Sequence, residues 1–355
     1  MFTYDVSHSD LHREIYEQPE MMKVCIEKNE ENVKEIAKLV RERRISKVVL
    51  VGRGSSEHAL IVGKYAFEVY TDAVASMCSP SVITRMNGKM NLGDCLVIGI
   101  SQCGMAQDAY TVLEKCKNDG GIAVSITNER ECLMRNAGTH YLNMEVEKEY
   151  SFTAGKSYMA STILVLLLVA YIAENESLLK SVHDMPSMIQ KTLDSGMEEN
   201  IAKAVTLFRN ANDITILARG FSFAVAHETE LKIMEASYTI AKTYSSCDYP
   251  HGPIATTRRF TPVIFYLTDK TTDESTLSLI QKLQNDFSIS TLVVTNKEEY
   301  VSYGNEAILL PKEAEGIDAV CPLAVFSQLF CCILAFARGY NPDAPVGLSK
   351  VTVTL

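Results

Sequence analysis

The sequence predicts an α/β protein of two doubly wound αβα domains, each built on a parallel sheet and related by an internal duplication. Short β-branched runs alternate with helical patterns in both halves of the 355-residue chain. The predicted strands are apolar throughout, which is typical of parallel strands covered by helices on both faces. Sequence landmarks also recur at a nearly constant spacing, so the two halves share one pattern.

The duplication rests on three landmarks that recur in the same order. Their pairs are Gly54 and Gly220, Ser101 and Thr268, and Asn128 and Asn296. The members of these pairs are 166, 167 and 168 residues apart, respectively. The first pair lies in a strand that ends in Arg-Gly-x-Ser in both halves. A steady offset over three landmarks indicates a repeated unit.

Each half is expected to alternate strands and helices. The first half has expected strands at 47–51, 73–77, 95–101 and 122–126, and helices near 56–70, 106–118 and 155–173. The second half has expected strands at 213–218, 262–267 and 290–295, and helices near 222–242, 274–287 and 322–338. The predicted segments are an N-terminal helical extension (1–34), a first domain (35–175), connecting helices (176–208), a second domain (209–340) and a C-terminal tail (341–355).

Composition and charge argue against several classes of protein. The chain is 47% apolar and 22% charged, and its net charge of −10 argues against nucleic acid or an anionic membrane as the main partner. The acidic N-terminus is unlike a signal peptide, and the longest apolar run, residues 159–173, is too short to cross a bilayer. We therefore expect a cytoplasmic protein with a large core.

The cysteines and histidines give no sign of a metal site. Ten cysteines occur without a Cys-x-x-Cys pair, and they are expected to be reduced because no export signal precedes them. The histidines are scattered, without the spacing of metal ligands. Dinucleotide-binding and nucleoside-triphosphate loops are missing as well. We expect no metal and no cofactor.

Residues 224–253 carry the candidate catalytic groups. Glu228, Lys232 and Glu235 stand at i, i+4 and i+7, which places them on one stripe of a largely apolar helix. Buried charges are costly unless they are paired or used. His251 follows in a His-Gly-Pro turn, and together these groups suit proton transfer on a sugar. The alternative is a paired helix face and a turn histidine without a catalytic role.

Two loops in the first half are candidate anion-binding sites. The segment 52–56 and the segment 101–104 each follow a predicted strand and open a helix, where backbone N–H groups favour anions. The candidate phosphate-binding residues are Ser55, Ser56, Ser101, Gln102, Cys103 and Gly104. The alternative is that serine and glycine only cap the helices. The matching loop of the second half, at 268–272, lacks glycine and carries an acid, so that half is expected to have lost the phosphate site.

These motifs in this order resemble the tandem SIS (sugar isomerase) domain family, whose domains are flavodoxin-like. The motifs are a strand with Gly-x-Ser, a strand with Ser-Gln-x-Gly, Glu-x3-Lys-x2-Glu and His-Gly-Pro. The chain is similar to the isomerase half of glucosamine-6-phosphate synthase. It is still more similar to the SIS-type glucosamine-6-phosphate deaminases, through residues 51–59, 156–158 and 341–352.

The resemblance implies a role for each candidate residue. Ser56, Ser101, Gln102 and the amide of Gly104 would hold the sugar phosphate. Glu235 would move a proton between C1 and C2, and Lys232 and Glu228 would complete its charged cluster. His251 would assist ring opening from the other subunit of a homodimer, and Lys350 would line the sugar. The family needs no cofactor.

The chain departs from the family at two loops. Cys103, Met105 and Ala106 replace residues of the usual Ser-Gln-Ser-Gly-Glu-Thr loop, so two hydroxyls that often touch phosphate are missing. Residues 247–250 replace the common Gly-Glu-x-x before the histidine, which puts sugar specificity in doubt. No N-terminal cysteine-nucleophile domain is seen in the sequence, so glutamine-dependent amide transfer is not expected.

Three functions remain open at this point. The leading hypothesis is an isomerase/deaminase of an amino-sugar 6-phosphate, which releases ammonia. The second is a deglycase that splits a phosphorylated Amadori compound and releases an amino acid. The third is a sugar-phosphate sensor without catalysis, although residues 1–45 show no basic recognition helix and the Glu/Lys/Glu and His cluster points to chemistry.

Overall fold

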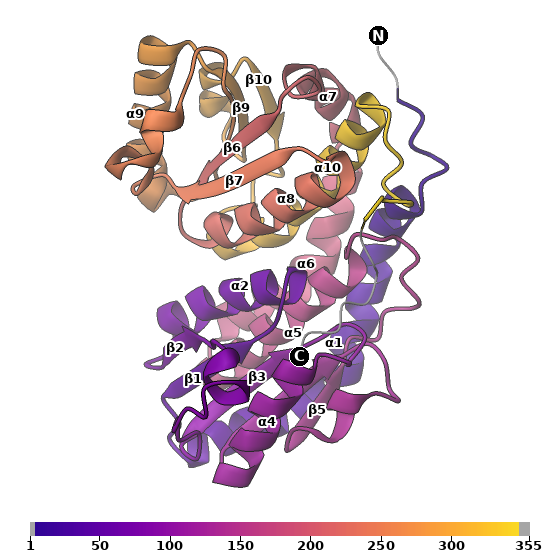
Figure 1. The fold of residues 1–355 in the computed structure, drawn as a ribbon, viewed down its shortest axis with the longest axis vertical. Helices are drawn as coiled ribbons and strands as arrows, with labels where there is room; N and C mark the ends of the chain where they lie inside the picture. Colours follow the sequence, from indigo (N-terminus) through magenta and orange to yellow (C-terminus); the bar gives the residue numbers. More distant parts are fainter. Residues whose placement is uncertain (1–3, 348–355) are drawn as a thin grey trace. The chain divides into compact units, whose positions relative to one another are not determined.

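Each half of the chain forms a five-stranded parallel sheet in the computed structural model, which describes residues 4–347 (Figure 1). The first-sheet unit comprises residues 20–149 and 156–184. Among the described residues, the second-sheet unit comprises 4–19, 150–155 and 185–347. The predicted α/β fold of two doubly wound domains is confirmed.

The first sheet has the strand order β2-β1-β3-β4-β5. Its strands are β1 (Lys47–Val51), β2 (Val74–Met77), β3 (Cys95–Ile100), β4 (Ile122–Thr127) and β5 (His140–Asn143). β1 and β3 pair from Lys47 opposite Cys95 to Val51 opposite Gly99. The chain therefore builds outward from β1 in one direction and then, from β3 onward, in the other.

Helices cover both faces of the first sheet. The longer ones are α1 (Asp10–Glu42), α2 (Ser55–Tyr70), α4 (Gln107–Asp119) and α5 (Lys156–Ala173), and the short ones are α3 (Ser81–Thr84) and η1 (Leu133–Asn136). α4 packs its buried side chains on the face that carries Cys95 and Val97. α2 and α5 pack against each other on the other face (Figure 1).

The second sheet repeats this plan with the order β10-β9-β8-β6-β7. Its strands are β6 (Asp213–Ala218), β7 (Ile240–Ser245), β8 (Pro262–Leu267), β9 (Ser290–Thr295) and β10 (Glu306–Leu309). Counted from its first strand, this order is the same as in the first sheet. Both are the 2-1-3-4-5 order of flavodoxin-like folds.

The helices of the second-sheet unit also take matching places. They are α7 (Met197–Ala204), α8 (Phe221–Ser237), α9 (Lys270–Phe287) and α10 (Val320–Ala337), preceded by α6 (Glu176–Leu193). Short turns of helix complete it: η2 (Val205–Leu207), η3 (Tyr249–His251), η4 (Pro253–Thr256), η5 (Glu298–Tyr303) and η6 (Gly316–Ala319). α9 covers one face through Leu279, Ile280 and Leu283, and α8 packs with α10.

The duplication extends to backbone conformation. Gly54, before α2, has φ 55° and ψ −131°, and Gly220, before α8, has φ 66° and ψ −141°. Only glycine adopts this region without strain. The two Arg-Gly-x-Ser turns are therefore the same turn, built twice.

The structure corrects the predicted helix at 222–242. α8 ends at Ser237, and Tyr238 closes it in a left-handed conformation with φ 52°. The next residues form β7, which pairs with β6 from Asp213 opposite Ile240. The apolar and β-branched residues after Tyr238 belong to this edge strand rather than to a longer helix. The sequence prediction also missed the four-residue edge strands β5 and β10.

Among the residues that the structure describes, two helical segments have the length and composition of a membrane span, Lys156–Ala173 and Gly316–Ala337. In the most apolar 18-residue stretch of each segment, 83% and 94% of the residues, respectively, are buried inside the protein. Both are core helices, which accounts for their apolar sequences.

Candidate functional site

The two candidate anion loops lie at the same edge of the first sheet. Residues 52–54 follow β1, and Ser55 and Ser56 open α2. Residues 101–104 follow β3, the neighbour of β1. Parallel neighbours end at the same edge, and β1 and β3 flank the point where the strand order reverses, which is where doubly wound sheets bind ligands. The structure thus brings the six predicted phosphate-binding residues to one edge.

Backbone contacts brace the 101–104 loop. The amide of Ser101 donates to Ile126 O at 3.1 Å, and the amide of Asn128 donates to Gln102 O at 3.0 Å. Gly104 has φ 65°, and a Cβ there would stand 2.3 Å from Cys132 Sγ. Glycine is therefore required at this position by both conformation and space.

An arginine that the sequence interpretation passed over links the first of these loops to the start of α4. Arg53, in the loop after β1, donates from Nε and Nη2 to Asp108 Oδ2, each at 2.9 Å. Asp108 lies in the first turn of α4, and its side chain is 6% exposed, whereas that of Arg53 is 55% exposed. The carboxylate of Asp108 thus holds a solvent-facing guanidinium beside the start of α4. The sequence signal that could have identified this pair was an arginine in the Gly-rich turn after β1 and an acid at the start of the helix that follows β3.

The second sheet carries the same arginine but not the same site. Arg219 precedes Gly220 as Arg53 precedes Gly54, and its Nη1 contacts Ser275 Oγ at 3.4 Å. Asp269 caps α9 by accepting from the amide of Thr271 at 2.9 Å. The protein's own carboxylate therefore occupies the helix terminus that an anion would use.

A buried ion pair adds to this difference between the sheets. Asp273, in the first turn of α9, pairs with Lys297 Nζ at 2.8 Å, and its side chain is 2% exposed. Burial raises the pKa of Asp273, although the Lys297 ammonium opposes that shift. These internal acids make the α9 terminus unsuited to a phosphate.

Helix α8 carries the three predicted ionisable residues in one cluster. Lys232 Nζ lies 2.6 Å from Glu228 Oε1 and 3.5 Å from Glu235 Oε2. Burial alone would lower the pKa of Lys232, but Glu228 and Glu235 raise it above the usual lysine value. The lysine is thus a buried ammonium between two carboxylates.

Solvent exposure separates the members of this cluster. The side chains of Lys232 and Glu228 are 0% and 1% exposed, whereas that of Glu235 is 23% exposed. α10 packs on α8, and burial raises the pKa of its Cys331 thiol well above the usual value. Of the three charged groups, the carboxylate of Glu235 is the one that a ligand can reach.

Of the two remaining predicted residues, the structure describes only His251. His251 ends η3 and is exposed, and Gly252 follows with φ 150°. No hydrogen bond or ion pair joins His251 to the α8 cluster within residues 4–347. Lys350 lies outside the described residues. Within the same residues, no group of three or more His, Cys, Asp or Glu side chains stands ready to hold a metal ion.

Relatives of known sequence match nearly the whole length of this chain. Glutamine–fructose-6-phosphate aminotransferase (isomerizing) of Aquifex aeolicus is 27% identical over 348 residues, which cover 97% of this chain and 57% of the relative. The enzyme of the same name from Pyrobaculum aerophilum is 28% identical, with the same coverage of both chains. The chain thus spans a little over half the length of these relatives.

Solved structures share the fold. The C-terminal domain of glucosamine-fructose-6-phosphate aminotransferase from Francisella tularensis superposes with a TM-score of 0.84 at 19% identity, over 97% of this chain and 100% of that one. Glucosamine-6-phosphate deaminase from Thermotoga maritima superposes with a TM-score of 0.75 at 21% identity, over 98% and 100%. Both cover the two sheets together.

A sequence profile of the SIS domain matches residues 40–171 and again residues 207–332. The two matched segments hold the two sheets, and together they span well over half of the chain. The predicted resemblance is confirmed, and the chain belongs to the SIS domain family.

Proposed function

We propose that the protein is a phosphosugar isomerase/deaminase that acts on an amino-sugar 6-phosphate. The observation that carries the proposal is the arrangement of the α8 cluster: the partly exposed carboxylate of Glu235 lies against the buried ammonium of Lys232, which also pairs with the buried carboxylate of Glu228. Such a carboxylate is suited to general-base catalysis. The names of the Aquifex aeolicus and Thermotoga maritima proteins support a phosphosugar substrate.

In the proposed reaction, Glu235 takes the proton from C2 of the open-chain aminoaldose and returns a proton to C1. This transfer gives a ketose imine, and water then adds at C2 and releases ammonia. Glucosamine 6-phosphate and water would thus yield fructose 6-phosphate and ammonia. These reaction steps need no oxidant, reductant or cofactor, because a proton moves within the sugar and no electrons leave it.

The other predicted residues take positioning roles in this proposal. The loops 52–56 and 101–104 hold the phosphate with serine hydroxyls, backbone amides and the Arg53 guanidinium. Arg53 would supply the charge that compensates for the hydroxyls missing at Cys103 and Ala106. Lys232, which pairs with Glu228, holds Glu235. His251, from the partner subunit of a homodimer, assists ring opening, and Lys350 lines the sugar.

The test is a panel of substrates given to the purified protein. Glucosamine, galactosamine and Amadori-type 6-phosphates are incubated separately, and released ammonia, released amino acid and ketose phosphate are quantified. Ammonia with an equal amount of ketose phosphate supports the deaminase.

The same panel measures the alternatives. A free amino acid without ammonia would instead identify the deglycase that the sequence left open. Binding without any product, on every member of the panel, would contradict an enzymatic role and favour the sensor.

A further inference from the structure

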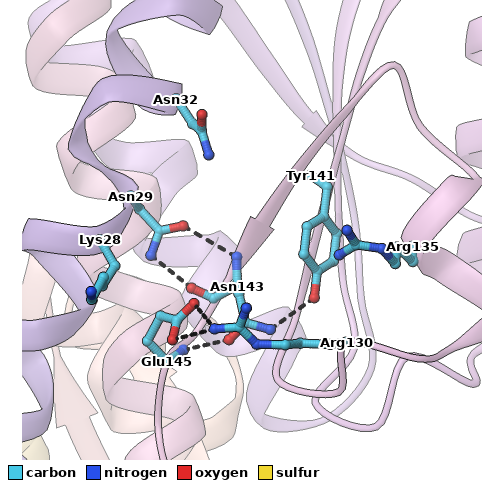
Figure 2. Close-up of a pocket in the computed structure, with 8 residues that line it drawn as sticks. All are labelled: Lys28, Asn29, Asn32, Arg130, Arg135, Tyr141, Asn143 and Glu145. Atoms are coloured by element: carbon cyan, nitrogen blue, oxygen red, sulfur yellow. Dashed lines mark hydrogen bonds and ion pairs between the residues drawn. The ribbon is translucent and has the colours of Figure 1, made fainter.

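The first-sheet unit contains a cavity of about 380 Å³ between α1 and the ends of β4 and β5 (Figure 2). Its lining residues are Lys28, Asn29, Asn32, Arg130, Arg135, Tyr141, Asn143 and Glu145. None of these belongs to the loops 52–56 or 101–104. We call this cavity the α1–β5 pocket. Its volume falls in the range of small-molecule sites.

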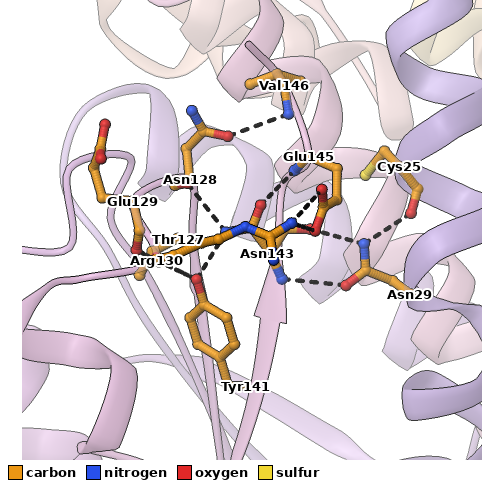
Figure 3. Close-up of polar contacts among 10 residues, drawn as sticks. All are labelled: Cys25, Asn29, Thr127, Asn128, Glu129, Arg130, Tyr141, Asn143, Glu145 and Val146. Carbon is orange, nitrogen blue, oxygen red and sulfur yellow. Dashed lines mark hydrogen bonds and ion pairs between the residues drawn. The ribbon is translucent and has the colours of Figure 1, made fainter. Parts of the chain in front are cut away.

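Two asparagines form the floor of the pocket. Asn29 donates from Nδ2 to Asn143 O at 2.7 Å, and the amide of Asn143 donates to Asn29 Oδ1 at 3.1 Å (Figure 3). Their side chains are buried, and Asn29 Nδ2 also donates a hydrogen bond to Cys25 O. The side chain of Asn29 thus bonds to both the N–H and the C=O group of Asn143, as the backbone of a neighbouring strand would. This contact fixes α1 against edge strand β5.

A tyrosine forms a rigid wall beside this floor. The Tyr141 hydroxyl accepts from Asn143 Nδ2 at 2.8 Å and lies 3.1 Å from the Thr127 hydroxyl. Asn143 Oδ1 accepts from the amide of Glu145 at 2.8 Å, which turns the chain after β5 (Figure 3). These polar groups satisfy one another, so the floor and wall are preformed.

The rim of the α1–β5 pocket, by contrast, carries cations whose N–H donors are not all used within the protein. Arg130 reaches both carboxylate oxygens of Glu145 through one nitrogen, Nη2, at 2.6 and 2.7 Å. The Arg130 side chain is 67% exposed, so its other N–H groups remain open to solvent. The Arg135 guanidinium lies 4.6 Å from the centre of the Tyr141 ring, a stacked position that leaves its edge free to donate.

Figure 2 shows how these cations face the cavity. Lys28 and Asn32 come from α1 on one side, and Arg130 and Arg135 come from the segment between β4 and β5 on the other, with Arg135 in η1. Three cations and one carboxylate line the pocket, which leaves an excess of two positive charges in a chain of net charge −10. A local positive excess in an acidic protein favours a dianion.

From this arrangement we infer that the α1–β5 pocket binds the phosphate group of a small phosphorylated molecule. Arginine pairs bind phosphate through parallel N–H donors, and Lys28 adds a point charge. Asn32 offers a neutral donor and acceptor to the remainder of the ligand. The inference does not depend on the proposed reaction, because it uses different residues from those of the anion loops and α8.

The chain contains no tryptophan, so the tryptophan fluorescence of a single-tryptophan variant comes from the introduced residue alone. Asn136→Trp places the reporter on an exposed position next to Arg135. Titration with inorganic phosphate should change the reporter fluorescence along a saturating curve. Adding Arg130→Gln and Arg135→Gln should weaken the apparent affinity at least about tenfold, since each removes charge-assisted hydrogen bonds.

Two controls separate the pocket from other phosphate sites. Arg44→Gln removes the same charge from an exposed position outside the pocket and should leave the titration unchanged. Ser56→Ala with Ser101→Ala should also leave the reporter response intact, because those residues belong to the anion loops. Unfolding midpoints of all variants establish that each remains folded.

Three results would overturn the inference. One is no saturable response to phosphate or glucose 6-phosphate up to tens of millimolar. Another is an unchanged affinity in the double arginine variant. The third is a response to citrate without any response to phosphate, which would assign the pocket to carboxylates instead.

Discussion

Glu235, Lys232 and Glu228 share one helix stripe but have different surroundings. Lys232 and Glu228 are sealed in the interior, and only Glu235 opens to solvent. The i, i+4, i+7 spacing predicted the stripe, because helix geometry is local. Which member is exposed could not be predicted, because exposure depends on how neighbouring elements such as α10 cover α8.

Glu235→Gln is expected to abolish turnover while the protein stays folded. The amide keeps the shape of the side chain but cannot accept the proton, and loss of a general base costs on the order of 10²–10⁴ in rate. Steady-state kinetics on the substrate identified by the panel, with a thermal melt of the same preparation, measure both parts. Glu274→Gln, an exposed change on α9, is the matched control.

The contrast within the same cluster is Lys232→Met. Removing this ammonium leaves Glu228 as an uncompensated buried charge, which costs about 3–5 kcal/mol of unfolding free energy. Because the pKa of Lys232 is raised above 10.5, its stabilising contribution is present at neutral pH and is lost only as the pH rises through that raised value.

For the first of these two variants, near-normal activity in Glu235→Gln would reduce Glu235 to a structural partner of Lys232.

At the scale of elements, the pairing of β1 with β3 creates the candidate phosphate site. The pairing brings together Arg53 and Asp108, which are 55 residues apart in the chain. The sequence predicted both loops, because each is a local strand–turn–helix pattern. It could not predict the Arg53–Asp108 contact, because that depends on strand order and register.

Arg53→Gln is expected to raise KM for the sugar phosphate about tenfold or more with a smaller effect on kcat. The guanidinium would contact the phosphate, which does not react, so its loss weakens ground-state and transition-state binding alike. Arg219→Gln removes the equivalent arginine of the second sheet and should leave KM unchanged, since the protein's own carboxylates occupy the α9 terminus there. Equal losses in both variants would contradict the assignment of phosphate to the first sheet.

Element boundaries show a second limit of prediction from sequence. Residues 238–242 continue the apolar pattern of α8, so the sequence pattern predicts a helix that runs through them. Tyr238 ends the helix in a left-handed turn, and β6 supplies the hydrogen bonds that make β7 a strand. The four-residue strands β5 and β10 are equally dependent on their neighbours β4 and β9. Short edge strands follow from tertiary pairing more than from their own residues.

At the scale of the whole molecule, one fold has been used twice and has diverged in its sites. The glycines before α2 and α8 keep one unusual conformation, and the two sheets keep one strand order. What changed are the charged groups at the helix termini: Asp108 of α4 holds the exposed Arg53 in one half, whereas Asp269 caps α9 and Asp273 pairs with Lys297 in the other. Backbone geometry was retained in both halves, while the side chains at the sheet edges took separate roles.

The proposed assembly gives the last prediction. His251 is exposed and makes no bond to the α8 cluster in the described part of its own chain, as expected of a residue that serves a partner's site. We expect inactive Glu235→Gln and inactive His251→Ala subunits to regain part of the wild-type activity when mixed under conditions of exchange. Each mixed dimer would contain one centre with an intact Glu235 and a partner's intact His251.

The magnitude follows from random pairing. Equal amounts of the two variants give mixed dimers in about half of the population, with one working centre of two, so about a quarter of the wild-type activity should return. Mass spectrometry of differently labelled subunits verifies that exchange has occurred, and each variant mixed with itself is the control. Full exchange without recovered activity would place His251 and Glu235 of a working centre on the same chain, and the partner role of His251 would be rejected.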